Sequence, residues 1–345
     1  MSRRHGVLAV VLTAALAVAA CGSDDYPSSG ATDASGSGST PGTTLTLVTY
    51  DSFPESDTGL HEALAEFTAS TGIGVRQLVA GDAGTMLAKA ALTAGNPEGD
   101  VMWGVDNTLL SRALDNDVFD GEPTAVDFGD VCVNADLEWF ADRDLALPAT
   151  LDDLAAPAYR DLLVVTNPAT SSPGLAFLLA TIDQYGADGW QDYWQALVDN
   201  GVTVVDGWSQ AYYEEFTRAG GPSPLVVSYG SSPPAEVIFA DPPRDDAPTT
   251  VIEDTCFRQV EYAGVLRGTE HTDAARTLVE FLVSERFQRE LPLTLFVYPV
   301  NEDVELPAEF VEFAVVPDDP RTLDPDVIEA DRERWIDEWT SLVLG

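Results

Sequence analysis

The sequence predicts an α/β fold with two lobes, each a mainly parallel sheet flanked by helices. Strand-like and helix-like segments alternate from residue 44 to residue 127, and a second alternating series begins near Phe128. After Glu261 the pattern returns to helices. A β-α-β order favours parallel strands with helices on both faces. We therefore expect one lobe from residues 44–127 and 262–345 and another from residues 128–261, with a hinge that the chain crosses twice.

Three strands and three helices are expected in the first series. The strands are apolar or β-branched runs. The first helix carries Leu60, Leu64 and Phe67 on one face, and Gly72 ends it. The expected strands are residues 44–50, 73–80 and 100–105, and the expected helices are residues 58–71, 85–94 and a segment that Asp106 caps and that carries Leu109, Leu110 and Leu114.

The second series follows the same pattern. Ser172 is expected to be the N-cap of a helix that has Pro173 as its first residue. The expected strands are residues 162–166, 202–205 and 225–228, and the expected helices are residues 173–185, 188–200, 209–219, 272–283 and 324–344, with one more helix that begins near Ser232.

The N-terminus predicts export and a lipid anchor. Two arginines precede an apolar run at residues 6–20, which is too short to span a membrane permanently. The run ends in Val-Ala-Ala-Cys-Gly, which resembles a bacterial lipobox with Cys21 at the lipidated position. Residues 1–20 are thus expected to be a signal peptide and residues 21–43 a disordered tether. The alternative is an ordinary signal peptide that is cut elsewhere.

The net charge of the chain limits the kinds of partner that it can bind. It has 17 basic and 58 acidic residues, for a net charge of −41. Such a charge argues against nucleic acid or an anionic membrane surface as partner. It suits a cationic ligand, although strong acidity is also a common adaptation for solubility.

The remaining cysteines, Cys132 and Cys256, lie in strand-like segments of a chain that is expected to work in an oxidising compartment. We predict a disulfide between them, with two free buried thiols as the alternative. Neither cysteine has the spacing of a metal ligand, so no metal site is expected.

Catalytic motifs are absent from the sequence. Of three histidines, His5 lies in the signal peptide, and His61 and His271 occupy polar helix positions. No Gly-x-Ser-x-Gly elbow, phosphate-binding loop or His-x-x-x-His pair occurs. We expect a binding protein, not an enzyme, and no cofactor.

Three patches are candidate ligand contacts, because each lies where a predicted strand ends. Trp208 precedes a hydroxyl-rich turn at residues 229–233, and its ring is either core or cleft. Residues 170–174 open a helix that either binds an anion or is simply capped. Tyr50 ends the first strand and offers a stacking face, and the neighbouring Asp51 either takes an amine or caps a turn.

With these segments, the chain from Thr44 onward resembles the thiamine-binding proteins of bacterial ABC transporters. The matching segments are T-Y-D-S-F (49–53), L-V-A…G (78–84), G-V-D-N-T-L-L (104–110), N-P-A-T-S-S-P-G (167–174), G-W-S-Q-A-Y (207–212), L-V-V-S-Y-G-S-S-P (225–233) and Y-P-V (298–300).

The resemblance implies a type II periplasmic-binding-protein fold that closes over thiamine or its phosphates and delivers them to permease subunits from the periplasm or cell surface. We expect a monomer. A thiazolium cation suits Trp and Tyr faces, each worth roughly 0.5–2 kcal/mol. The ligand contacts carried over from the family are Ala83, Gly84, Ser171, Ser172, Trp208, Tyr229, Gly230, Ser231, Ser232 and Pro233.

Two departures from the family pattern concern aromatic residues. The family has an aromatic residue where this chain has Ala235. It has tryptophan where this chain has Phe296, which we also expect to contact the ligand. Losing one stacking face would cost on the order of 1 kcal/mol, which permits weaker thiamine binding or a related heterocycle.

Two alternatives remain. Ferric-iron binders of the same fold use adjacent tyrosines, but Gly230 follows Tyr229, and the Tyr212-Tyr213 pair lies in a predicted helix where its rings should diverge. An enzyme acting on thiamine-like substrates would need a cysteine or acid nucleophile in the cleft.

Overall fold

The computed structural model describes residues 42–345. The predicted signal peptide, the lipid attachment at Cys21 and the predicted tether up to residue 41 lie outside the described residues. In the described part of the chain, no helix has the length and apolar character needed to cross a membrane.

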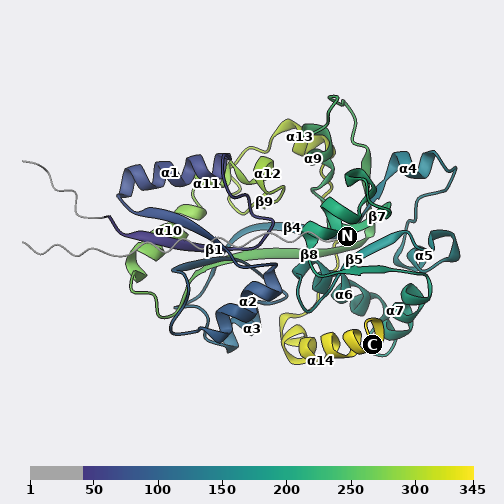
Figure 1. Ribbon diagram of the computed structural model, residues 1–345, viewed down its shortest axis with the longest axis horizontal. Coiled ribbons are helices and arrows are strands. Elements are labelled where there is room, and N and C mark those ends of the chain that lie inside the picture. The colour runs from purple at the N-terminus through teal and green to yellow at the C-terminus, as the bar shows by residue number, and fades with distance from the viewer. Residues whose placement is uncertain (1–41) are drawn as a thin grey trace, which may run out of the picture. The chain divides into compact units, whose positions relative to one another are not determined.

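Within residues 42–345, nine strands form one sheet in the order β2-β1-β3-β8-β4-β7-β5-β6, with β9 beside β4 (Figure 1). The strands at each end of this order pair in parallel, while β8 and β4 pair antiparallel with each other and with their other neighbours. The strands are β1 (Thr44–Thr49), β2 (Gly74–Val79), β3 (Val101–Asp106), β4 (Thr124–Asp136), β5 (Leu163–Thr166), β6 (Thr203–Val205), β7 (Leu225–Tyr229), β8 (Thr249–Val265) and β9 (Tyr298–Pro299).

Helices cover both faces of the sheet, as the β-α-β order predicts. At the β1 end, α1 and α10 lie on one face and α2 and α3 on the other (Figure 1). The helices are α1 (Gly59–Thr71), α2 (Ala83–Leu92), α3 (Leu110–Asp115), α4 (Leu137–Ala141), α5 (Leu151–Leu154), α6 (Ser172–Tyr185), α7 (Trp190–Asp199), α8 (Trp208–Gln210), α9 (Pro233–Ile238), α10 (Thr272–Leu282), α11 (Glu285–Gln288), α12 (Leu291–Thr294), α13 (Ala308–Phe313) and α14 (Pro325–Val343), with short turns η1 (Pro157–Tyr159), η2 (Ala211–Glu215) and η3 (Thr217–Ala219).

Most predicted elements are present with ends shifted by one to three residues, but three predictions were wrong. Residues 209–219 are not one helix: α8, the π-helical turn η2 and η3 follow one another. The N-cap of α6 is Ser171, not Ser172, and no side chain caps it. The reason is that the Ser171 hydroxyl donates to Asp82, while the Ser172 hydroxyl accepts from Gln259.

Asp106 caps a turn that precedes α3, and not the helix itself. Its Oδ1 accepts hydrogen bonds from the backbone N–H groups of Thr108 and Leu109, at 3.0 and 3.1 Å. The helix begins one residue later, at Leu110.

The C-terminal helix α14 packs mainly against α7. Trp339 and Trp194 form an edge-to-face pair with ring centroids 5.3 Å apart, and both are fully buried. On α14, Arg332 also donates to the carbonyl of Thr108, which precedes α3. Since α14 contacts segments from both predicted lobes, the lobe boundaries stay a prediction.

Cys132 of β4 and Cys256 of β8 form a disulfide, which confirms the predicted pairing. The bond lies where the register of the two strands shifts, between the pairs Val131–Phe257 and Val133–Ile252. It therefore joins the two longest strands of the sheet at an irregular point.

Candidate ligand-binding site

The carboxyl ends of the parallel strands meet at a cavity of about 730 Å³. Its wall includes residues that follow five different strands: Tyr50 after β1, Asp82 after β2, Ser172 after β5, Trp208 after β6 and Ser232 after β7. Ligands of open α/β sheets bind at this edge, and the volume is typical of a small-molecule site.

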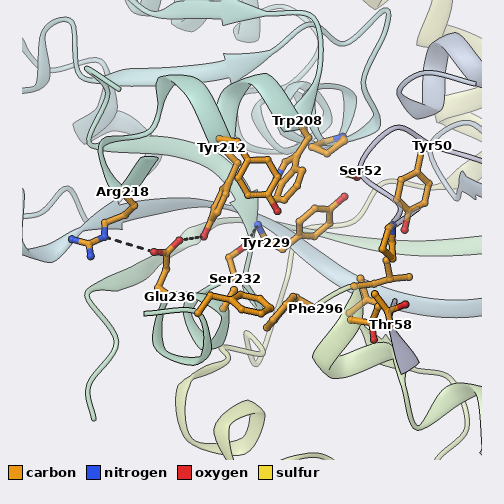
Figure 2. Close-up of a pocket in the computed structure, with 18 of the residues that line it drawn as sticks. Tyr50, Ser52, Thr58, Trp208, Tyr212, Arg218, Tyr229, Ser232, Glu236 and Phe296 are labelled. Carbon is orange, nitrogen blue, oxygen red and sulfur yellow. Dashed lines mark hydrogen bonds and ion pairs between the residues drawn. The ribbon is translucent and has the colours of Figure 1, made fainter. Parts of the chain in front are cut away.

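Aromatic rings form one wall of the cavity. Trp208 stacks on Tyr212 with centroids 5.0 Å apart and an interplanar angle of 18°, and it meets Tyr213 edge to face at 5.4 Å. Tyr229 lies 6.4 Å from Trp208, and in the view of Figure 2 it lies between Trp208 and Tyr50. In the predicted helix, the side chains of Tyr212 and Tyr213 would point in different directions. Their rings are nearly perpendicular, yet the π-helical turn brings both against Trp208.

Trp208 serves the core and the cavity together. Its indole N–H donates to Ser228 Oγ at 2.9 Å, and it packs beside a small apolar cluster that includes Val226 and Phe216. The same side chain lines the cavity. Both alternatives considered for this residue are therefore partly right.

Phe296, in the segment between α12 and β9, contributes another ring to the cavity wall. Its backbone has φ of 55°, a left-handed conformation that non-glycine residues seldom adopt. The Ser231 hydroxyl donates to its carbonyl. Its ring meets Phe239 at 5.8 Å, and Phe239 follows Ala235 by four residues. Although the family's aromatic residue is replaced by Ala235, Phe239 places an aromatic ring in the same part of the cavity wall.

Asp82 lies among the starts of three helices, and from residues 170–174, suggested as an anion site, it takes only the Ser171 hydroxyl. Its carboxylate accepts from the backbone N–H groups of Ala83 at 2.7 Å and Trp208 at 3.0 Å, and from the Ser171 hydroxyl at 3.1 Å. Burial raises the pKa of Asp82 to about 6, helped by the charge of Asp51 and opposed by these hydrogen bonds. The protein therefore supplies its own carboxylate to these donors.

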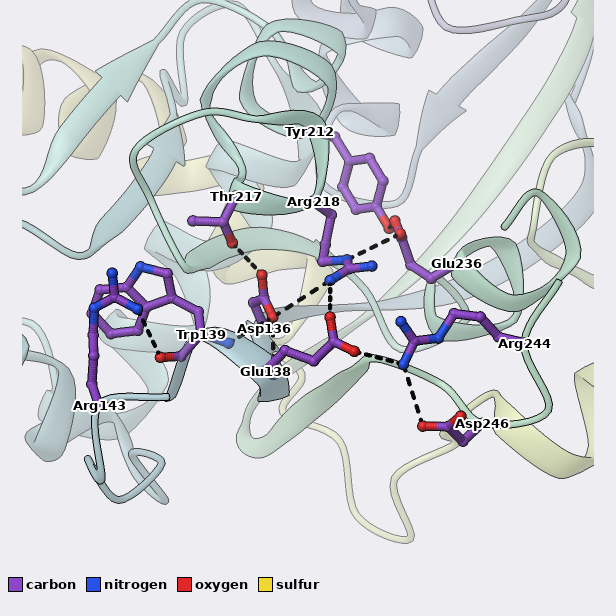
Figure 3. A network of polar contacts seen from close by, with 10 residues as sticks. All are labelled: Asp136, Glu138, Trp139, Arg143, Tyr212, Thr217, Arg218, Glu236, Arg244 and Asp246. Atoms are coloured by element: carbon purple, nitrogen blue, oxygen red, sulfur yellow. Dashed lines mark hydrogen bonds and ion pairs between the residues drawn. The ribbon is translucent and has the colours of Figure 1, made fainter. Parts of the chain in front are cut away.

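A network of ion pairs lies at the other end of the cavity (Figure 3). Arg218 pairs with Glu138 at 2.8 Å and approaches Glu236 at 3.7 Å, and Arg244 reaches the second oxygen of Glu138 at 2.7 Å. Tyr212 donates to Glu236 at 2.7 Å, which ties the aromatic wall to the network (Figure 2). Both arginines line the cavity with carboxylate partners already in place.

Three buried carboxyl groups lie together next to the cavity, and one of them, that of Glu261, lines it. Glu261 of β8 is paired in register with Asp106 of β3 and Asp127 of β4. Burial raises the pKa of Asp127 to about 7, opposed by a hydrogen bond from Trp103 Nε1. Burial also raises the pKa of Asp106, opposed first by its hydrogen bond from Gln259. The part of the cavity wall at Glu261 is thus acidic, whereas the part at Arg218 and Arg244 carries arginines that are already paired.

Within residues 42–345, no group of three or more His, Cys, Asp or Glu side chains is arranged to hold a metal ion.

The sequence profile of the family described as "Bacterial extracellular solute-binding protein" matches residues 105–319. The chain belongs to this family. This solute-binding protein is 32% identical over 313 residues to the thiamine-binding periplasmic protein of Salmonella typhimurium, covering 87% of this chain and 93% of that protein.

Solved structures agree with the family. A periplasmic thiamin binding protein superposes with a TM-score of 0.77 at 27% identity, over 87% of this chain and 96% of its own. The ferric binding protein of Campylobacter jejuni shares the fold alone, with a TM-score of 0.67 at 15% identity over 86% of this chain and 99% of its own. The predicted type II periplasmic-binding-protein fold is confirmed, and the protein binds solutes without catalysing a reaction.

The structure brings most of the predicted contact residues of this solute-binding protein to one cavity. Those that line it are Tyr50, Ala83, Ser172, Trp208, Tyr229, Ser232 and Phe296. Asp51, whose role the sequence left open, accepts a 3.5 Å hydrogen bond from Ser209 and does not line the cavity.

Five predicted contacts lie outside the cavity wall: Ser171, Gly84, Gly230, Ser231 and Pro233. Each has another structural partner. Ser171 and Ser231 use their hydroxyls within the protein. A Cβ on Gly84 would lie 2.8 Å from the carbonyl oxygen of Thr170, and one on Gly230 would collide with that of Val315. Pro233 is buried in the first turn of α9.

Several lining residues of this solute-binding protein were not predicted, namely Asp82, Tyr212, Tyr213, Arg218, Glu236, Phe239 and Glu261. Asp82 lies two residues after a predicted strand, so a search for polar residues near strand ends would also have found it. Glu261 gave no such signal, because it lies inside a strand and its neighbours come from distant parts of the sequence.

Proposed function

We propose that this protein is an extracytoplasmic receptor that captures thiamine, its phosphates or both in the cavity and hands the ligand to the permease of an ABC transporter. The thiamine-binding relatives support this ligand. So does the confirmed solute-binding family, whose members bind without chemistry.

The observation that carries the proposal is a cavity with aromatic walls and an acidic inner side. Tyr50, Trp208 and Tyr229 offer ring faces, and Asp82 and Glu261 offer carboxyl groups in the same cavity. A thiazolium ring is a flat cation, which aromatic faces attract by roughly 0.5–2 kcal/mol each, more when water is excluded. The carboxyl group of Asp82, whose pKa is about 6, is mostly ionised at pH 7 and adds a favourable field for a positive ligand.

Capture by hinge closure is part of the proposal. The cavity wall draws on residues 50–83 and 294–297 of the first predicted lobe and on residues 172–244 of the second. A relative rotation of two such lobes would open and close the site. The chain's resemblance to receptors of this fold supports that mechanism.

Attachment to the membrane through Cys21 is proposed from the sequence alone. A lipid at Cys21 would hold the receptor on the outer face of the cytoplasmic membrane, beside its permease. Metabolic labelling with a radioactive fatty acid tests this, because Cys21→Ala should remove the label.

Calorimetry of the purified, ligand-free protein tests the ligand. We expect heat and one-to-one binding with thiamine, thiamine monophosphate or thiamine diphosphate. Fe(III) presented as a citrate complex serves as the comparison ligand, because ferric-binding proteins share the fold. Tight iron binding with no heat from any thiamine form would overturn the proposal.

A further inference from the structure

Glu261 lies at the centre of a row of three acids that the sequence keeps far apart. It is the register partner of Asp106 on one side and of Asp127 on the other. Glu261 lines the cavity, with 7% of its surface exposed, whereas its two neighbours are buried and do not line it. It is therefore the member of the row that a ligand can reach.

One of the two carboxyl oxygens of Glu261 lacks a hydrogen-bond partner in the part of the chain that the structure describes. Its Oε2 atom is buried and has no hydrogen bond within the described residues. Asp106 accepts from Thr108 and Gln259. Asp127 accepts from Trp103 Nε1 at 3.0 Å through one oxygen, and its Oδ1 also lacks a partner among residues 42–345, but Asp127 does not line the cavity. A buried polar atom without a partner is costly, and such an atom in a cavity wall is commonly satisfied by ligand or water.

The surroundings of Glu261 favour its neutral, protonated form. Burial and the charges of Asp127, Asp106 and Asp82 raise its pKa well above the usual value for a glutamate. Tyr50 and Tyr229 also face it, and they too are buried groups with raised pKa values. The groups that shift its pKa include no arginine or lysine to counter its charge. A protonated carboxyl can both donate and accept a hydrogen bond.

We propose that Glu261 is a specificity-determining residue whose neutral carboxyl pairs with an aminopyrimidine edge of the ligand. In this pair the carboxyl O–H donates to a ring nitrogen while the carbonyl oxygen accepts from the adjacent amino group. The inference rests on the proposed function, since thiamine carries an aminopyrimidine with this donor–acceptor edge. It explains why an acid, and not an arginine, faces the cavity at this point.

Two substitutions separate a neutral hydrogen-bonding role from a charge. Glu261→Gln keeps one donor and one acceptor but cannot ionise, so thiamine affinity at pH 7 should stay within about threefold of wild type. Glu261→Leu removes both groups, and affinity should fall about 10- to 100-fold, as expected when a polar ligand group loses its partner. Calorimetry measures each affinity, and circular dichroism checks that each variant is folded.

A thiamine analogue without the 4-amino group tests the same contact from the ligand side and needs no variant. Wild type should bind the analogue about 10- to 100-fold more weakly than thiamine, and Glu261→Leu should bind the two equally. Titration in buffers with different ionisation enthalpies should show no proton release on thiamine binding to wild type.

The outcomes are distinguishable. If wild type binds no thiamine form, the proposed function fails. The inference alone fails if thiamine binds wild type but Glu261→Leu still prefers thiamine over the analogue by the wild-type factor. It also fails if Glu261→Gln loses as much affinity as Glu261→Leu, because the residue then acts as an anion.

Discussion

At the scale of single residues, the cavity depends on side chains that have two tasks. Trp208 packs on a buried apolar cluster with one part of its ring and lines the cavity with another. Asp82 joins the starts of α2, α6 and α8 through three hydrogen bonds while it faces the same space. Because these residues are already held by the protein, a ligand meets groups whose positions are set in advance, which lowers the entropy cost of binding.

Replacing Trp208 with alanine should weaken thiamine binding about 2- to 30-fold. The change removes a ring face worth roughly 0.5–2 kcal/mol to a cation and exposes the stacked face of Tyr212. Thiamine should quench the tryptophan fluorescence of wild type, and this response should disappear in Trp208→Ala. Trp139→Ala is the matched control, since Trp139 does not line the cavity. Equal quenching in Trp208→Ala and wild type would contradict the assignment.

At the scale of elements, the long strands β4 and β8 hold the two parallel parts of the sheet together. Their pairing is interrupted next to the disulfide, where Thr255 fills the gap: its hydroxyl accepts from Val133 N–H at 2.8 Å and donates to the Ile252 carbonyl at 2.6 Å. The backbone N–H of Arg321 donates to the carbonyl of Cys256 at 2.9 Å. The Cys132–Cys256 bond thus reinforces an irregular point at the centre of the sheet.

Replacing both cysteines with serine should lower the free energy of unfolding by about 2–5 kcal/mol, because the bond restricts a long loop in the unfolded chain. Urea unfolding followed by circular dichroism measures this. Wild type unfolded with a reducing agent should match the double variant, which separates loss of the bond from the effect of the serines. An unchanged midpoint would show that the bond contributes nothing to stability.

At the scale of the whole molecule, acidic residues are gathered inside the protein as well as on its surface. The chain carries a net charge of −41, and Asp82, Asp106, Asp127 and Glu261 are buried or nearly so around the cavity. Burial raises the pKa of each of these carboxyl groups, so the folded protein binds protons more tightly there than the unfolded chain does. Stability is therefore linked to pH.

The sign of this linkage predicts a loss of stability as pH rises. The pKa of Asp127 is about 7 and that of Asp82 about 6 in the folded protein, against about 4 when unfolded. Their contribution is present below pH 4 and is lost as pH rises towards 7. The thermal midpoint should therefore be lower at pH 7.5 than at pH 5.

Asp127→Asn tests the origin of this loss, because an asparagine can still accept from Trp103 but cannot ionise. Its midpoint should fall less between pH 5 and pH 7.5 than that of wild type, as measured by thermal circular dichroism. Glu309→Gln, a change at an exposed carboxylate, should leave the wild-type difference in place. If the thermal midpoint of Asp127→Asn falls as much between pH 5 and pH 7.5 as that of wild type, ionisation of Asp127 does not cause the loss of stability.

Local patterns in the sequence were enough to predict the alternation of strands and helices, the parallel strand groups and the disulfide. They also placed Tyr50, Trp208 and Tyr229 at strand ends, since apolar periodicity and turn residues act over a few neighbours. The same rules failed at residues 209–219, because stacking of Tyr212 on Trp208 accompanies a π-helical turn that no local signal announces.

The sequence alone therefore determined the order of the elements, the solute-binding class and the strand ends that bear the aromatic residues. Only the tertiary structure decided that Asp106, Glu261 and Asp127 form one row, and that Gly84 and Gly230 pack against backbone. It also decided that Asp82 accepts from the Ser171 hydroxyl and from the N–H groups that open α2 and α8. These features depend on pairing between residues up to 155 positions apart. Such pairing is set by sheet register and by the burial of whole elements, which local periodicity does not encode.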